Sequence, residues 1–179
     1  MDDELLEISK KTGAAADIRN VCLTRIREGK ISRDENPGSH FCVYFAAYDP
    51  EERLVFIGRH IKSGLWLFNG GHIDKNESPT QTLVREIKEE WGNSIKIDRI
   101  EKPRLLTITT IDNQIQPCKT HFDIWYFLPF NSETFNPNQE LLAAEFHETG
   151  WKTLKEARRL TKDKNTLKGI DETERLLRK

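Results

Sequence analysis

The chain lacks an excess of charge of either sign, because 28 lysine and arginine residues stand against 29 aspartate and glutamate residues among its 179. A near-zero net charge argues against bulk electrostatic binding to nucleic acid or to a membrane surface. Long apolar runs are also missing, since the longest, at residues 41–48 and 124–130, have the length of strands and are too short to span a bilayer. The composition, 36% hydrophobic and 32% charged, therefore predicts a soluble globular protein.

Cysteine is scarce. Cys22, Cys42 and Cys118 are odd in number and far apart in the sequence, and they show neither zinc-binding nor redox spacing. Residues 1–4 are acidic and are not followed by the apolar run that a secretory signal requires. We therefore expect a cytoplasmic protein with reduced thiols, in which Cys42 is a core residue.

The most informative segment is residues 71–92. Its central part, 78–91, is predicted to be one helix, because Ser78 is a natural N-cap, Pro79 suits the first helical position and Gly92 supplies a stop. Three apolar residues follow the helical repeat, namely Leu83, Ile87 and Trp91. We expect this stripe to be buried, with the other faces of the helix free for chemistry.

Three carboxylates share a face of the same helix, because Glu86, Glu89 and Glu90 lie three and four residues apart. Such a group is often only a solvated surface. Here the repulsion among the carboxylates would be removed by a hard divalent cation, for which their oxygens are suitable ligands. Arg85 could orient a carboxylate through a bidentate pair, and the glycine loop at 69–72 could approach a cation and a phosphate. These features together indicate metal-assisted attack of water on a phosphoanhydride.

These residues resemble the Nudix box, G-x5-E-x7-R-E-U-x-E-E-x-G-U, where U is a bulky apolar residue. The matching positions are Gly71, Glu77, Arg85, Glu86, Ile87, Glu89, Glu90 and Gly92. Asn93 departs from the pattern at its last position, where an apolar residue is usual, and Asn69 stands where proline is common in many bacterial members. The resemblance extends over roughly residues 40–155.

The resemblance implies an α/β fold, a Nudix-like α/β/α sandwich with a mixed sheet between helices. It also implies a site for Mg²⁺ or Mn²⁺ formed by Glu86, Glu89, Glu90 and the carbonyl oxygen of Gly71. In the family a further acidic ligand often comes from outside the box; Glu145 and Glu148 are the candidates here, with a slight preference for Glu148. One of these glutamates would act as general base, Arg85 would orient, and Glu77 would support the corner between loop and helix.

Substrate contacts are predicted from positions near the box. These are Trp66, Gly70, His72, Arg59, His121 and Asp123. Trp66 is either a core residue or a ring that stacks on a base. Arg59 could meet phosphate charge, and His72 is a turn residue or a phosphate contact. His121 and Asp123 alternate with core residues along a predicted strand, so they are paired with each other, exposed, or directed into a pocket.

The rest of the pattern predicts a single Nudix-like domain over residues 1–179. Residues 1–39 would form an N-terminal helical extension broken near residues 12–13, residues 40–155 the core, and residues 156–179 a C-terminal helix. Within the core, strands are expected at 40–48, 54–58, 65–68, 105–111, 121–129 and 146–151. A loop is expected at 112–119, a short helix at 139–144, and closing helices at 154–160 and 167–177.

The function expected from this reasoning is divalent-metal-dependent hydrolysis of a nucleoside diphosphate linked to another group, with free or damaged nucleoside triphosphates as the first candidates. Nucleotide sugars, dinucleoside polyphosphates and capped RNA ends are open alternatives. A catalytically silent nucleotide-binding regulator on the same fold is the rival from another class. The expected partner is a small-molecule nucleotide, with no membrane and no bulk nucleic acid, and homodimer formation through the terminal helices is left open.

Overall fold

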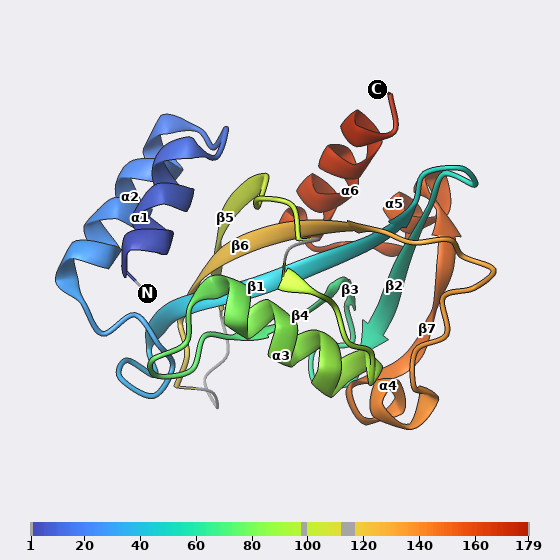
Figure 1. Cartoon of the computed structure of the whole chain (residues 1–179), viewed down its shortest axis with the longest axis horizontal. Helices are drawn as coiled ribbons and strands as arrows, with labels where there is room; N and C mark the ends of the chain where they lie inside the picture. The colour runs from blue at the N-terminus through green and yellow to red at the C-terminus, as the bar shows by residue number, and fades with distance from the viewer. Residues whose placement is uncertain (1, 98–99, 112–116, 179) are drawn as a thin grey trace. The chain divides into compact units, whose positions relative to one another are not determined.

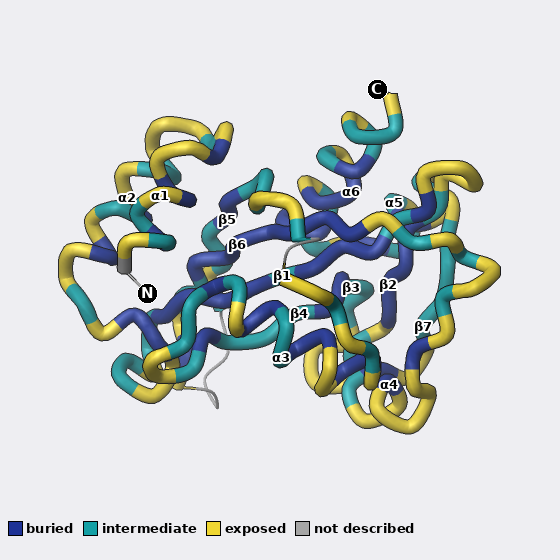
Figure 2. The backbone as a smooth tube through the Cα atoms, viewed as in Figure 1, coloured by how far each residue is buried: buried dark blue, intermediate teal, exposed yellow. Residues whose placement is uncertain are grey.

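The architecture is that of a computed structural model, which describes residues 2–97, 100–111 and 117–178. Within these residues seven strands form one sheet, in the order β3-β2-β1-β6-β5, with β4 paired to β1 and β7 paired to β2. The long strands β1 (Ser39–Asp49) and β6 (Thr120–Pro129) are buried along most of their length (Figures 1 and 2). Their near-continuous apolar sequence is the reason, since both faces of each strand are covered.

The described residues divide into two compact units. The first unit comprises Met1–Tyr44, Gly70–Leu83 and Lys102–Tyr126, and the second comprises Phe45–Asn69, Val84–Glu101 and Phe127–Lys179. The strands β1 and β6 and the helix α3 (Pro79–Trp91) each contribute to both units. The predicted boundaries of a single domain with a core at 40–155 stay a prediction.

In the first unit the helices α1 (Asp2–Lys11) and α2 (Ala16–Glu28) lie side by side, and α2 packs on β5 (Leu105–Thr110) (Figure 1). The predicted helical break lies between these helices. The strands β5 and β6 are antiparallel, with Thr107 opposite Asp123. The hydroxyl of Thr80 in the first turn of α3 donates to the Glu4 carboxylate at 2.6 Å, which joins α1 to α3.

In the second unit β2 (Leu54–His60) pairs antiparallel with β1, as the predicted hairpin requires. It also pairs antiparallel with β3 (Trp66–Leu67) and, along the opposite edge, with β7 (Phe146–Thr153). The helices are α4 (Gln139–Glu145), α5 (Leu154–Leu160) and α6 (Lys164–Leu176). Thr153 and Glu156 form a capping box that begins α5, and Asp163 caps α6. Residues 156–179, predicted as a C-terminal helix, therefore contain the end of α5 and all of α6.

One local prediction is wrong. Residues 69–72 were expected to be a glycine loop, and they form the strand β4 (Asn69–His72), which pairs with β1. The absence of a side chain allows this pairing, because a Cβ atom on Gly70 would lie 2.5 Å from the carbonyl oxygen of Val43. Of the predicted loop at 112–119, residues 112–116 lie outside the described residues. In the described part of the chain, no helix has the length and apolar character needed to cross a bilayer.

Candidate active site

The helix α3 forms as its sequence predicts. The backbone N–H of Gln81 donates to the Ser78 hydroxyl at 3.3 Å, and the Ser78 N–H donates to the Gln81 side chain at 2.9 Å, so the first turn is capped in both directions. Gly92 ends the helix with a φ of +68°, in the left-handed region that favours glycine. The stripe of Leu83, Ile87 and Trp91 is fully buried. Its burial fixes the rotation of the helix and thereby the direction of its acidic face.

The acidic face carries three carboxylates with different exposure. Glu86 and Glu90 are nearly buried, at 8% and 9% of their possible exposure, whereas the Glu89 side chain is 58% exposed. Burial of a carboxylate is costly unless it is paired or bound to a metal. Arg85 places one guanidinium nitrogen, Nη1, 2.7 Å from Glu86 and 3.0 Å from Glu89, so a single cation bridges two carboxylates. Arg85 therefore contacts the carboxylates that it was predicted to orient, and that role stays a prediction.

Asn69 is a member of this site that sequence reasoning missed. Its side-chain amide, at 1% exposure, donates a hydrogen bond to the Glu90 carboxylate. A proline at this position would have no such donor. The departure from the family pattern at Asn69 was the sequence signal that could have identified this residue. In the structure the Asn69 side chain is a neutral hydrogen-bond partner for a nearly buried carboxylate.

We expect Asn69→Ala to lower the free energy of unfolding by about 1–3 kcal/mol, since the nearly buried Glu90 loses a donor. Chemical denaturation at neutral pH measures the effect. Asn20→Ala, at an exposed position on α2, is the matched control and should change stability little. Equal stability of the two variants would show that Asn69 does not hold Glu90 in solution.

Glu77 and Gly71 belong to the first unit. The Glu77 carboxylate accepts a hydrogen bond from the Thr82 hydroxyl at 3.0 Å, and its N–H donates to the carbonyl of Asp74 at 3.1 Å. Glu77 thus supports the corner between the preceding turn and α3, as expected. The role of the Gly71 carbonyl as a metal ligand stays a prediction.

The two candidates for an additional acidic ligand have different neighbours in the second unit. Glu145 lies 3.6 Å from His60 and 3.5 Å from Lys62, so two basic groups already share its charge. Glu148 is exposed and stands opposite Arg59 in the pairing of β2 and β7, and it lies 3.8 Å from Lys152. The preference for Glu148 as a further ligand stays a prediction.

Trp66 is half-buried on the short strand β3. The ammonium group of Lys152 lies 5.5 Å from the centre of its ring, a cation–π contact. The indole is therefore not sealed within the core, and one face is held beside a positive charge. Both predicted roles, packing and stacking on a base, stay open for this residue.

Asp123 is buried in the first unit, at 1% exposure. Its carboxylate accepts hydrogen bonds from the hydroxyls of Thr107 at 2.8 Å and Thr109 at 2.6 Å on the neighbouring strand β5. The indole N–H of Trp125 donates to Thr107 at 2.9 Å, which extends the network. Both hydroxyls donate to the same oxygen, Oδ2, so the partners of this oxygen come from the neighbouring strand, an arrangement that the pattern of β6 alone did not predict.

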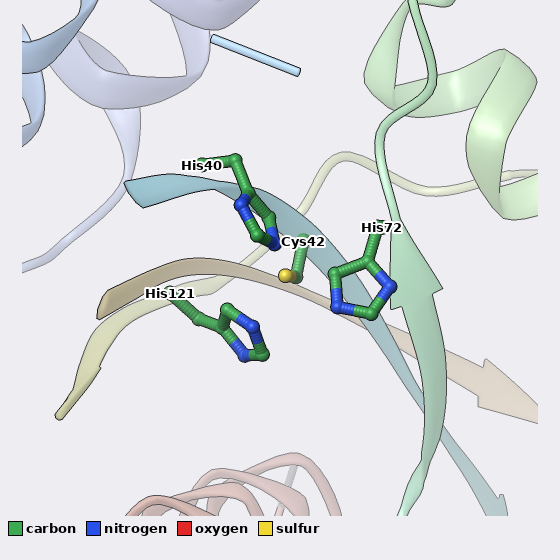
Figure 3. Close-up of side chains that lie close together, drawn as sticks. All are labelled: His40, Cys42, His72 and His121. Carbon is green, nitrogen blue, oxygen red and sulfur yellow. The ribbon is translucent and has the colours of Figure 1, made fainter. Parts of the chain in front are cut away.

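His121 and His72 come together with His40 and Cys42 in the first unit (Figure 3). The centres of the His40 and His72 rings are 4.9 Å apart, and each lies 5.0 Å from that of His121. Burial, and to a smaller extent the nearby His40, lowers the pKa of His121 to about 4. Burial also lowers the pKa of His40, against the opposing effect of its hydrogen bond to the Asn36 carbonyl. Both rings are therefore neutral at pH 7.

The chain belongs to the NUDIX domain family, whose sequence model matches residues 38–172. The match begins where the N-terminal extension was predicted to end, and it continues beyond residue 155 into α6. The family membership confirms the resemblance inferred from the box and supports the predicted class of enzyme, a pyrophosphohydrolase.

Among solved structures, the chain is similar to the E. coli dihydroneopterin triphosphate pyrophosphohydrolase, with 15% identity and a TM-score of 0.58 over 74% of this chain and 92% of that one. It is also similar to a NUDIX family hydrolase from Clostridium perfringens, with 27% identity and a TM-score of 0.53 over 77% and 97% of the two chains. These likenesses confirm the predicted α/β/α sandwich.

A curated relative, the 8-oxo-dGTP diphosphatase of Proteus vulgaris, is 40% identical over 47 residues. That alignment covers 25% of this chain and 42% of the relative, so the chain spans less than half of the relative's length. The likeness is therefore confined to a segment, and it carries no statement about the substrate by itself.

Proposed function

We propose that the chain hydrolyses a phosphoanhydride bond in a nucleoside triphosphate or related nucleotide with the help of a divalent cation. The observation that carries this proposal is the acidic face of α3, where Arg85 bridges Glu86 and Glu89 and Asn69 donates to Glu90. Two of these three carboxylates are nearly buried, a costly arrangement that cation binding would stabilise. Family membership supports the same reaction class.

The donor set fits Mg²⁺ or Mn²⁺, because these ions prefer carboxylate and carbonyl oxygens. We propose Glu86, Glu89 and Glu90 as the ligands, with the Gly71 carbonyl and Glu148 as further members. The bound cation would supply Lewis acidity that offsets charge on the phosphates and makes water a better nucleophile.

The chain's own groups would do the positioning and the proton transfer. Arg85, already in contact with Glu86 and Glu89, would hold both carboxylates in place and would not react. One glutamate of the group would accept the proton that the attacking water loses. Asn69 would keep Glu90 directed toward the site through its hydrogen bond to that carboxylate. The Asn69 amide N–H is a donor, so Asn69 itself would not accept the proton from water.

For the substrate, we propose contacts to phosphate by Arg59 and to the base by Trp66, beside which Lys152 adds positive charge. Gly70, His72, His121 and Asp123 stay candidate contacts from the first unit. A triphosphate is favoured because the named activities of two proteins similar to this chain, the E. coli and the Proteus vulgaris enzymes, both concern triphosphates. Nucleotide sugars and dinucleoside polyphosphates are the alternatives to include in any assay.

The test is release of pyrophosphate or phosphate from a panel of nucleotides, with and without cation. We expect turnover of nucleoside triphosphates, canonical or damaged, in Mg²⁺, its loss in EDTA, and its recovery when excess Mg²⁺ is added. Undiminished turnover in EDTA would contradict the metal dependence. Absence of turnover on every nucleotide, in folded protein that still binds one of them, would support the silent nucleotide-binding regulator instead.

A further inference from the structure

We propose that His40, Cys42, His72 and His121 form a binding site for a transition-metal ion of the Zn²⁺ type. The four residues belong to three strands, β1, β4 and β6. All four residues lie in the first unit. This site has a ligand chemistry different from that of the carboxylates on α3, and it does not depend on the proposed hydrolytic function.

The geometry of the cluster suits a metal ion. Each residue offers one ligand atom, and these four atoms all lie within 4.8 Å of one another. In a tetrahedral zinc site, bond lengths of about 2.0–2.3 Å place neighbouring ligand atoms roughly 3.3–3.8 Å apart. Displacements of the side chains by about an ångström would therefore bring all four ligand atoms within bonding distance of one ion. Figure 3 shows the three imidazole rings arranged around the sulfur atom of Cys42.

The chemistry of the ligands selects the kind of ion. Imidazole nitrogens and a thiolate are the donors preferred by zinc and other borderline or soft transition metals. Mg²⁺ and Ca²⁺ prefer oxygen ligands, and none of the four side chains offers one. Three nitrogens and one sulfur also complete a tetrahedral shell, which is typical of a structural zinc site.

The surroundings of His40 prepare it for coordination. Its Nδ1 atom lies 3.0 Å from the carbonyl oxygen of Asn36, to which it can donate. That hydrogen bond leaves Nε2 as the nitrogen with a lone pair, the usual arrangement of a metal-binding histidine whose other nitrogen is held by an outer partner. His40 itself is fully buried at 0% exposure, on the strand β1, so neighbouring side chains surround its ring.

His121 gives an independent indication. Its Nε2 atom is buried and makes no hydrogen bond within the described part of the chain. A buried nitrogen without a partner is costly, and it calls for an explanation such as a bound ion. Coordination of a metal would satisfy this atom at the place where the rings of His40 and His72 also meet it.

Cys118 lies next to the cluster, with its sulfur atom 3.7 Å from Nε2 of His40. In the metal-free protein its thiol can donate weakly to that nitrogen. Metal binding at His40 would replace this contact. Cys118 is therefore a neighbour whose replacement tests whether the sulfur that binds the ion is that of Cys42.

The experiment is titration of the metal-free protein with Co²⁺, which reports tetrahedral geometry by its visible absorption and a cysteine ligand by a sulfur-to-cobalt charge-transfer band. We expect one equivalent of Co²⁺ to produce both signals, and Zn²⁺ to abolish them by displacement. Cys42→Ser should lose the charge-transfer band, and His121→Asn should weaken binding by about tenfold or more. Cys118→Ser should retain the band.

Matched controls separate this site from its surroundings. Cys22→Ala replaces a buried cysteine outside the cluster, and His147→Asn replaces an exposed histidine on β7, so both should bind Co²⁺ as the unaltered chain does. Glu89→Gln should also bind Co²⁺ with the charge-transfer band unchanged, whether or not it hydrolyses nucleotides. A failure of the proposed function is thereby distinguishable from a failure of this metal site.

Two results would overturn the proposal. One is the absence of any tetrahedral or charge-transfer signal in the folded, unaltered chain. The other is a charge-transfer band that persists in Cys42→Ser. If Cys42→Ser does not fold, His72→Asn, at a half-buried position, takes its place, and unchanged affinity for Co²⁺ in that variant would have the same meaning.

Discussion

Glu89→Gln is expected to lower kcat by about 10²–10⁴-fold, the range that loss of a group with a direct role in proton transfer or charge stabilisation produces. The substitution removes a negative charge and keeps the size of the side chain. If Glu89 holds the cation or accepts the proton of water, neither task can be performed by the neutral amide. Turnover of a nucleoside triphosphate in saturating Mg²⁺ measures the effect.

Glu89 is the sharpest of the three carboxylates to test because its side chain is 58% exposed. Glu86 and Glu90 are nearly buried, so their replacement would mix effects on folding with effects on catalysis. For Glu89 the main structural loss is its contact with Arg85 across one helical turn, and such exposed pairs contribute about 0.3–0.5 kcal/mol. A large loss of activity with an unchanged unfolding midpoint would therefore report on chemistry.

Glu140→Gln is the matched control, because Glu140 is also an exposed glutamate on a helix, α4. It should retain the activity of the unaltered chain. Near-normal turnover in Glu89→Gln, with the control equally active, would contradict the assignment of Glu89 to the metal site. Loss of activity in both variants would point to a general effect of charge on the protein.

The features that the sequence predicted correctly are those that depend on residues close together in the chain. The helix α3 was predictable because its cap, its glycine stop and the stripe of Leu83, Ile87 and Trp91 lie within fifteen residues of one another. The hairpin of β1 and β2 was predictable for the same reason, since the turn residues stand between two apolar runs. In both cases neighbours in the chain determine the structure.

The features that the sequence did not predict depend on pairing between distant segments. The partners of Asp123 are set by the register of β5 against β6, which places Thr107 opposite it. The histidine and cysteine cluster is formed by residues of three strands, β1, β4 and β6, so no spacing along the chain predicts it. His72 and His121 were singled out separately, and His40 and Cys42 share one face of a strand two residues apart, but only the sheet brings the four together.

The partner of Glu90 illustrates an intermediate case. Asn69 was noted as a departure from the pattern of the family, yet its amide meets Glu90 across 21 positions of the chain. A departure at one position indicates that something differs there, and only the hydrogen bond to Glu90 in the folded chain shows what the asparagine side chain does. Sequence reasoning thus located this residue and could not give its role.

Trp91→Ala is expected to lower the free energy of unfolding by about 3–5 kcal/mol, the usual cost of removing a large aromatic side chain from a core. Trp91 is 1% exposed and lies edge-on to four phenylalanine rings. The centre-to-centre distances are 4.8 Å to Phe45, 5.0 Å to Phe135, 5.7 Å to Phe130 and 6.4 Å to Phe56. The indole N–H makes no hydrogen bond in the described part of the chain, so the loss would come from packing alone.

The position of Trp91 makes this loss matter for function as well as for stability. It is the last residue of α3 and directly follows Glu90, so the aromatic group holds the end of the helix that carries the acidic face. We expect the variant to unfold at a clearly lower denaturant concentration and to lose activity in proportion to its unfolded fraction. Trp66 is half-buried and makes a cation–π contact with Lys152. Trp66→Ala should therefore lower the free energy of unfolding far less than Trp91→Ala does. Equal destabilisation by the two substitutions would show that Trp91 does not anchor the helix more strongly than a peripheral tryptophan does.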